Sequence, residues 1–204
     1  MKIFIDLDGT LIDPTDRIYE IFKDLVPKCE LSKNDYWELK KNGMSNFSIL
    51  EEKFNYLNNQ IKEFNDKWML NIEEVNWLKK DKLFNGVAES LKQLTNSSEL
   101  YLLTNRRNTN LVYSQLKNFK IDIYFKEILV AGKLGKSEVL KKLSLKKKDW
   151  IIGDTVDDIK VGKNNNILTA SVSSGVSSKD ILLKNNPDLI LNYFTEFDAN
   201  YWKI

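Results

Sequence analysis

Apolar residues follow two kinds of pattern, which divide the chain into three segments. A short apolar run at residues 2–6 ends in a turn signal, as is typical of a buried strand. From about residue 15 to 80, apolar and aromatic residues recur with helical spacing, in a stretch with almost no glycine. We expect this segment to form a bundle of about four short helices. The sides expected to face inward carry Ile18, Phe22 and Leu25; Phe47, Leu50, Phe54 and Leu57; and Ile61, Phe64, Trp68 and Ile72.

After residue 80 the pattern changes to alternating helices and strands. This alternation predicts βαβ crossovers and a parallel sheet. We expect strands at residues 99–104, 127–131, 150–153, 167–172 and 188–191, and helices at residues 87–94 and 108–119.

The helical segment interrupts the strand pattern, so it is an insertion. We predict an α/β fold with a three-layer, Rossmann-like core formed by residues 1–14 and 81–204. Residues 15–80 would form an inserted helical domain. Such an insertion, placed after the first strand, lies beside the crevice where open α/β sheets bind ligands.

The first strand is followed by an acidic motif. Asp6 and Asp8 lie two positions apart, so in an extended segment their side chains face the same side. Two carboxylates held close together repel each other unless a cation or a shared proton lies between them. Mg²⁺ is a natural occupant, and Gly9 and Thr10 would offer N–H groups to an anion. The alternative is an acidic turn after an edge strand.

Two later strands are followed by residues that could bind phosphate. Thr104 and Asn105 end an apolar strand and could donate to a phosphoryl oxygen, although an ordinary helix cap would have the same residues. Lys136 opens a predicted helix and could place its ammonium group on phosphate and a carboxylate. Lys133 is a competing candidate for that role.

A further acidic motif follows the strand at residues 150–153. Asp154 ends that strand, and Asp158 lies four residues later, on the same helix face if the helix has begun. Thr155 and Asp158 have the spacing of a capping box, which would explain Asp158 without any function. Capping does not explain Asp154. Asp157 is a second candidate for the later acidic position.

Composition narrows the chemistry. The chain has 204 residues, 42% apolar and 29% charged, as is typical of a soluble globular protein. Its net charge of +2 gives no strong field for nucleic acid or a membrane, and no apolar stretch approaches the roughly 20 residues of a membrane helix. The single cysteine, Cys29, excludes an internal disulfide, and we expect an intracellular, cytoplasmic protein. The absence of histidine excludes Ser-His-Asp triads and histidine-ligated zinc.

Taken together, these motifs resemble the haloacid dehalogenase-like hydrolase superfamily, in its phosphatase branch with phosphoglycolate-phosphatase-like members. The motifs occur in the family's order: Asp6-Leu7-Asp8-Gly9-Thr10-Leu11, Thr104-Asn105, Lys136, and Gly153-Asp154-Thr155-Val156-Asp157-Asp158. One departure is Asn85, where the family usually has proline, and another is Ser137, where proline often follows the lysine.

The resemblance implies a Mg²⁺-dependent phosphatase acting on a small phosphomonoester. Asp6 would be the nucleophile that forms an aspartyl-phosphate, and Asp8 the general acid, with a pKa raised by burial and by its acidic neighbour. The metal would be held by Asp6, the main-chain carbonyl of Asp8 and Asp154, with Asp158 or Asp157 behind them. Thr104, Asn105 and Lys136 would bind the phosphoryl group. The inserted helices would close over the site as a cap.

Two other functions are compatible with the sequence. One is a phosphotransferase on the same scaffold, and the other is a non-catalytic binding or regulatory protein that keeps the fold. The expected partner is a small phosphorylated metabolite, with no nucleic acid and no membrane, and the oligomeric state is open. Polar residues that could contact the substrate are Asp16, Arg17, Tyr19, Asn46 and Arg106.

Overall fold

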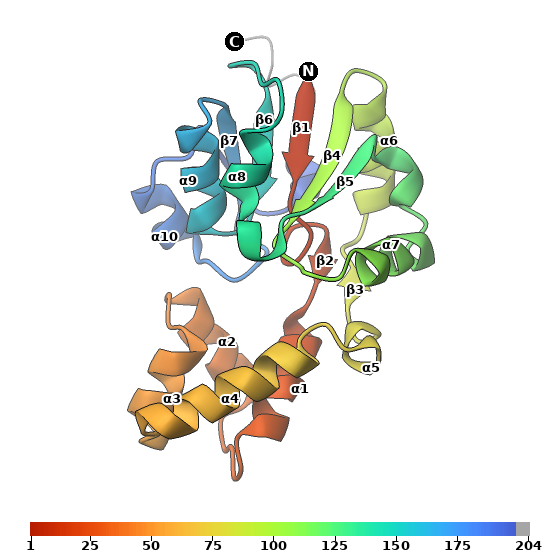
Figure 1. The fold of residues 1–204 in the computed structure, drawn as a ribbon. Helices are drawn as coiled ribbons and strands as arrows, with labels where there is room; N and C mark the ends of the chain where they lie inside the picture. Colours follow the sequence, from red (N-terminus) through yellow and green to blue (C-terminus); the bar gives the residue numbers. More distant parts are fainter. Residues whose placement is uncertain (199–204) are drawn as a thin grey trace.

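The computed structural model describes residues 1–198, and its centre is a six-stranded parallel sheet (Figure 1). The strand order is β5-β4-β1-β6-β7-β8, and every neighbouring pair is parallel. The strands are β1 (Lys2–Ile5), β4 (Glu99–Thr104), β5 (Glu127–Val130), β6 (Trp150–Gly153), β7 (Leu168–Val172) and β8 (Leu189–Leu191). These bounds confirm the six predicted strands to within one residue at each end.

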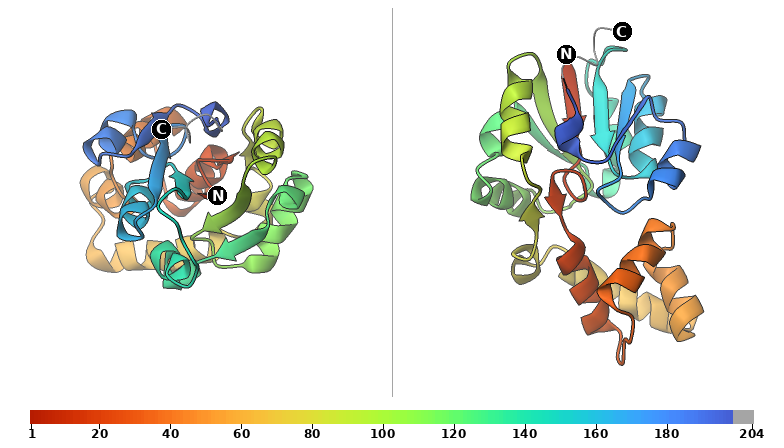
Figure 2. Two further views of the ribbon diagram at one scale, coloured as in Figure 1. Left: turned by 90° about the horizontal axis from the view of Figure 1, so that it is seen from above. Right: turned by 180° about the vertical axis from the view of Figure 1, so that it is seen from behind.

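Helices cover both faces of the sheet and give the three-layer core that the sequence predicted (Figure 2). Alternate residues of a strand point to opposite faces. Ile3 and Ile5 of β1 pack in the cluster that includes α6 (Val87–Thr95) and α7 (Thr109–Asn118). Phe4 packs on the other face, in the cluster that includes α8 (Lys136–Leu140) and α9 (Val156–Asn164).

The chain leaves this core after β1 and returns before α6 through a short ribbon that the sequence did not predict. In it, β2 (Ile12–Asp13) pairs antiparallel with β3 (Lys82–Leu83). The remaining short elements are α10 (Lys179–Lys184) and three 3-10 turns, η1 (Asp122–Tyr124), η2 (Gly132–Leu134) and η3 (Phe194–Glu196).

Between β2 and β3 the chain forms five helices. They are α1 (Thr15–Leu25), α2 (Lys33–Lys41), α3 (Asn46–Phe54), α4 (Asn58–Asn71) and the single turn α5 (Val75–Leu78). Helices α1 to α4 form a group of their own, below the sheet in Figure 1 and beyond the carboxyl end of β1. They share a separate apolar cluster whose buried members include Phe22, Tyr36 and Phe64.

Two residues that we expected to face inward in this helical group are exposed instead. Phe47 is 46% exposed and Leu57 is 68% exposed, whereas Ile49 and Leu50 are buried. For Leu57 the reason is that α3 ends at Asn55, whose left-handed backbone (φ 53°) breaks the helix. Leu57 therefore precedes α4 and does not continue the apolar face of α3.

None of the helices within residues 1–198 is long and apolar enough to cross a membrane.

Candidate active site

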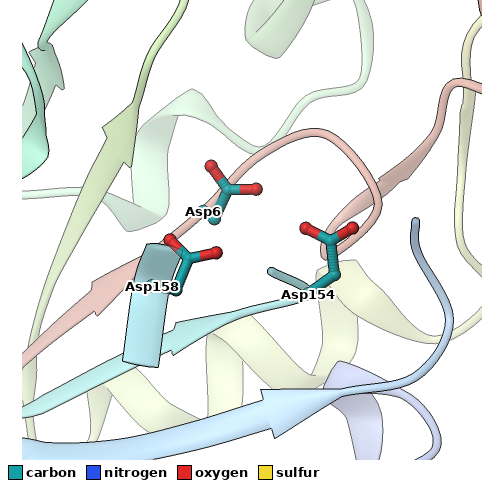
Figure 3. A group of neighbouring side chains, drawn as sticks. All are labelled: Asp6, Asp154 and Asp158. Atoms are coloured by element: carbon teal, nitrogen blue, oxygen red, sulfur yellow. The ribbon is translucent and has the colours of Figure 1, made fainter. Parts of the chain in front are cut away.

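Three buried carboxylates meet where the chain leaves the carboxyl ends of β1 and β6. Asp6 follows β1, Asp154 follows β6, and Asp158 lies in the first turn of α9. One oxygen from each lies within 4.8 Å of the others, and Figure 3 shows the three side chains around a common space. The residues are only 7%, 2% and 1% exposed. The acids of the first motif and of the motif after β6 therefore lie together, as we expected from the sequence.

Two glycines allow main chain to pass close to Asp154. A Cβ atom on Gly9, which has φ +82°, would lie 2.4 Å from an Asp154 oxygen, and one on Gly175 would lie 1.9 Å from the same atom. Both distances are too short for a side chain. On one oxygen Asp154 accepts a hydrogen bond of 2.7 Å from the N–H of Val176. These contacts fix the carboxylate at the strand end.

Lys136 brings one positive charge to the cluster. Its Nζ donates to Asp6 Oδ1 at 2.6 Å and to Asp158 Oδ1 at 2.5 Å, and the residue is 4% exposed. Burial disfavours the ammonium form, but Asp158 and Asp6 outweigh burial and raise the pKa of Lys136 above its usual value. Lys133, the competing candidate, is exposed in η2 and lines the outer cavity. Of the two lysines, Lys136 is the one that contacts the acidic cluster.

The electrostatics of the cluster fit a divalent cation. Burial raises the pKa of Asp6 to about 7, although Lys136 opposes this. Burial, followed by the charges of Asp6 and Asp158, raises the pKa of Asp154 well above its usual value. Asp154 Oδ1 is also buried without a hydrogen-bond partner in the described chain. Three carboxylates around one ammonium group leave unneutralised negative charge and a free oxygen ligand, which suit Mg²⁺.

Asp158 has two roles: it completes the capping box at the start of α9, and it belongs to the acidic cluster. Thr155 donates to Asp158 Oδ2 through its main-chain N–H at 3.2 Å and its hydroxyl at 2.6 Å. The other Asp158 oxygen accepts from Lys136. Asp157, the alternative at this position, is exposed. Capping and the contact with Lys136 therefore both depend on Asp158.

Asp8 lies beside the cluster but is held by two arginines. Arg106 donates to both of its oxygens, from Nε and Nη2, at 2.7 Å each, and Arg17 forms a second ion pair with Oδ1. Burial would raise the pKa of Asp8, but Arg106 and Arg17 outweigh burial and hold it well below its usual range. Our expectation of a raised pKa is therefore wrong, because the sequence did not reveal that Arg17 and Arg106 contact Asp8.

The two arginines are fixed from behind by buried acceptors. Asp81 accepts from Arg17 Nε at 2.7 Å and from Arg106 Nη2 at 3.0 Å. Arg17 Nη1 donates to the carbonyl of Ile72 at 2.6 Å, and Arg106 Nη1 donates to Gln115 Oε1 at 2.6 Å. Arg17 belongs to the helical insertion and Arg106 to the core, so this network connects the two.

A cavity of about 580 Å³ opens over the acids, between the sheet and the helical group. Asp6, Asp8, Thr104, Asn105 and Lys136 line its core side. Thr104 is buried, and its hydroxyl accepts from the N–H of Arg106 at 3.3 Å, which leaves the hydroxyl proton free for another acceptor. The insertion contributes two cations, Arg17 and Lys40, and an apolar wall formed by Ile18, Trp37, Trp68, Met69 and Ile72.

Three of the five residues that we expected to contact the substrate line the cavity, and two do not. Arg17, Asn46 and Arg106 line it. Asp16 instead pairs with lysines at the surface, and the Tyr19 hydroxyl donates to the carbonyl of Leu31. Sequence reasoning missed Lys40, Trp37 and Asp81. Their surroundings in the sequence held no signal, because nothing local distinguishes them from other polar or aromatic residues of the helices.

Comparisons with known proteins identify the family. Residues 3–172 match the model of the family described as haloacid dehalogenase-like hydrolase, so the chain belongs to this family. A search of curated proteins found no match.

Solved structures share the fold over almost the whole chain. A haloacid dehalogenase-like family hydrolase from Streptococcus pneumoniae is 25% identical with a TM-score of 0.79, over 98% of this chain and 97% of that one. A predicted phosphoglycolate phosphatase from Haemophilus somnus is 22% identical (TM-score 0.70; coverage 95% and 94%). YfnB from Bacillus subtilis, named as a HAD-hydrolase and solved bound to magnesium with interdomain movement, is 19% identical (TM-score 0.64; coverage 100% and 98%).

Proposed function

We propose that this protein is a Mg²⁺-dependent phosphatase that hydrolyses a small phosphomonoester through an aspartyl-phosphate. The observation that carries the proposal is the meeting of Asp6, Lys136 and Asp154 at the strand ends, beneath a cavity large enough for a small substrate. Membership of the hydrolase family supports the same reaction class.

In the first step, a carboxylate oxygen of Asp6 attacks phosphorus. An oxygen–phosphorus bond forms to Asp6, and the bond from phosphorus to the leaving-group oxygen breaks. Lys136 donates to Asp6 Oδ1 at 2.6 Å, so it orients the carboxylate while the second oxygen is left for attack. The same ammonium group would offset charge on the phosphoryl oxygens.

Asp8 is the candidate for proton transfer. Because Arg106 and Arg17 hold its pKa well below the usual range, Asp8 would first take up a proton from solvent. It would then give this proton to the leaving-group oxygen and later accept a proton from the water that attacks the aspartyl-phosphate, which releases phosphate and restores Asp6. Its side chain is 28% exposed, so it is accessible from the cavity. To reach a leaving group, Asp8 must turn away from Arg17 and Arg106.

Mg²⁺ would be held by Asp6 and Asp154, with the main-chain carbonyl of Asp8, and Asp158 would support the site from behind. When bound, it would neutralise phosphoryl oxygen charge and help to align the phosphorus with its attacking group. The unpartnered Oδ1 of Asp154 supports this assignment.

Thr104, Asn105 and Lys136 are the candidates for binding the remaining phosphoryl oxygens. The free hydroxyl proton of Thr104 supports its role, and Asn105 is exposed on the cavity wall. Phosphoryl transfer depends mainly on positioning and charge stabilisation, so donors at these positions would account for much of the rate.

Residues 15–80 would act as a cap over the core of residues 1–14 and 81–204. The apolar wall from Trp37 and Trp68 would exclude water and contact the leaving group. The substrate would therefore be a small phosphorylated metabolite.

The test is hydrolysis of a generic aryl phosphate by the purified protein. We expect phosphate release with Mg²⁺, and loss of release in excess chelator that is reversed by added Mg²⁺. An aryl phosphodiester should not be cleaved, because a second ester would fill the space of the phosphoryl oxygens. Full activity in chelator would contradict the metal role, and no hydrolysis of any phosphomonoester in a broad screen would contradict the proposal.

A further inference from the structure

We infer that the leaving group of the substrate carries its own anionic group, which binds Arg17 and Arg106 in the place that Asp8 occupies in the structure. This inference rests on the proposed phosphatase function and deepens it, because it names the substrate class and two residues that determine specificity.

The first observation is that Asp8 fills a site built for a planar anion. Three guanidinium donors converge on its carboxylate: Arg106 Nε and Nη2, and Arg17 Nη2. Arg106 and Arg17 are 6% and 2% exposed, so solvent is a poor substitute partner for these donors. Paired donors of this geometry bind carboxylates with high specificity.

The second observation is that the two guanidinium groups cannot follow Asp8 when it moves. Asp81, itself buried, accepts from both arginines, and the Ile72 carbonyl and Gln115 accept from their outer nitrogens. The remaining donors therefore point to one place, beside the acids and on the cavity wall.

Catalysis requires Asp8 to leave this place. An oxygen of Asp8 must meet the leaving-group oxygen, whereas both oxygens now accept from guanidinium donors. With a neutral leaving group, the turn of Asp8 would leave buried charged donors unpaired, which is strongly unfavourable. An anionic group on the substrate would replace Asp8 on the arginines and free it for the reaction.

The position of the arginines limits where this anionic group can lie. Asp8 now binds the two arginines, and during the reaction it must reach the ester oxygen of the substrate. The arginines and the ester oxygen are therefore separated by about the width of one carboxylate group. A carboxylate within two or three bonds of the ester oxygen meets this condition. Lys40 is the competing cation: it lines the same cavity, and its ammonium group has no hydrogen-bond or ion-pair partner within residues 1–198.

The experiment compares two phosphomonoesters of similar size, 2-phosphoglycolate and 2-hydroxyethyl phosphate, with Mg²⁺. For the native protein we expect kcat/KM for the carboxylate substrate to be higher by about 10-fold or more, the usual effect of hydrogen bonds to charged groups. Arg17→Met should remove most of this preference, and Lys40→Met should keep it. If Arg17→Met does not fold, Arg17→Lys serves instead, because it retains charge but loses the planar donor pair.

A binding measurement separates recognition from turnover. In the Asp6→Asn protein, calorimetry should show tighter binding of 2-phosphoglycolate than of 2-hydroxyethyl phosphate, and the difference should shrink in Asp6→Asn with Arg17→Lys. Equal kcat/KM and equal affinity for the two esters would overturn the inference and leave the phosphatase proposal intact. A preference that is lost in Lys40→Met but kept in the Arg17 variants would also overturn it. Absence of turnover on every phosphomonoester would instead contradict the proposed function.

Discussion

Lys136 Nζ lies 2.6 Å from Asp6 Oδ1, although 130 residues separate the two in the sequence. The parallel sheet makes this contact possible, because β1 ends just before Asp6 and pairs with β6, and Lys136 begins α8 near the carboxyl ends of these strands. This ion pair holds one oxygen of Asp6 next to the buried ammonium group of Lys136.

Replacing the proposed nucleophile should remove turnover and preserve the fold. We expect Asp6→Asn to lower kcat by a factor of at least ~10³, because the amide cannot form the aspartyl-phosphate. The measurement is aryl phosphate hydrolysis, with circular dichroism to check the fold. Asp157→Asn is the matched control, since Asp157 is exposed and outside the cluster. A folded Asp6→Asn protein with near-native kcat, free of contaminating phosphatase, would refute the assignment.

The two candidate lysines can be separated by the same substitution. Lys136→Met removes the cation that contacts Asp6 and Asp158, so we expect kcat/KM to fall by about 100-fold or more. Lys133→Met removes an exposed cation at the cavity rim and should lower kcat/KM by less than about 5-fold, in line with the small value of exposed charges. The reverse order of effects would assign the phosphate contact to Lys133.

Metal binding should stabilise the fold through Asp154. Burial and the charges of Asp6 and Asp158 raise its pKa, and its Oδ1 has no hydrogen-bond partner in the described chain, as suits an oxygen ligand for a cation. We expect Mg²⁺ to raise the Tm of the native protein, since a ligand that binds only the folded state stabilises it. Asp154→Asn should abolish the Mg²⁺-dependent rise and Asp157→Asn should keep it. If Tm in differential scanning calorimetry rises equally with Mg²⁺ in both variants, the metal binds elsewhere.

Lys40 should make stability depend on pH. Burial lowers its pKa from 10.5 to about 8, so between these values the unfolded chain binds more protons than the folded one. Stability from this group therefore rises with pH across that window, and below pH 8 the half-buried charge is unfavourable. We expect Lys40→Met to raise the free energy of unfolding at pH 7 by roughly 1–3 kcal/mol, with the gain vanishing near pH 10.5.

Urea unfolding at pH 7 and pH 10.5 provides the measurement for Lys40→Met. Lys62→Met is the control, because Lys62 is an exposed lysine on α4. An equal gain in the two variants, or a gain that does not change with pH, would contradict the role of burial.

The sequence predicted the sheet and the acidic cluster well, for a physical reason. Buried parallel strands need continuous apolar runs, and the residues that end them meet at one edge of the sheet. Asp6, Thr104 and Asp154 each directly end or follow such a run, so their convergence follows from the order of strands and turns in the sequence.

The arginine network could not be predicted in the same way. Arg106 lies 98 residues from Asp8, and Asp81 lies 64 residues from Arg17. The contacts of Arg17 depend on how the inserted helices are oriented on the core, and those of Arg106 depend on how distant loops of the core meet. No local pattern specifies either arrangement. Together, Arg17 and Arg106 reverse the expected direction of the pKa shift of Asp8. The apolar pattern of α3 failed at Leu57 because it does not register the helix break at Asn55.

Binding of beryllofluoride tests the central claim most directly, because this species mimics a phosphoryl group on a carboxylate. With Mg²⁺ present, ¹⁹F NMR of the native protein should show bound fluoride resonances, and these should disappear in chelator and in Asp6→Asn. Bound resonances that persist unchanged in a folded Asp6→Asn protein would contradict an aspartyl-phosphate on Asp6.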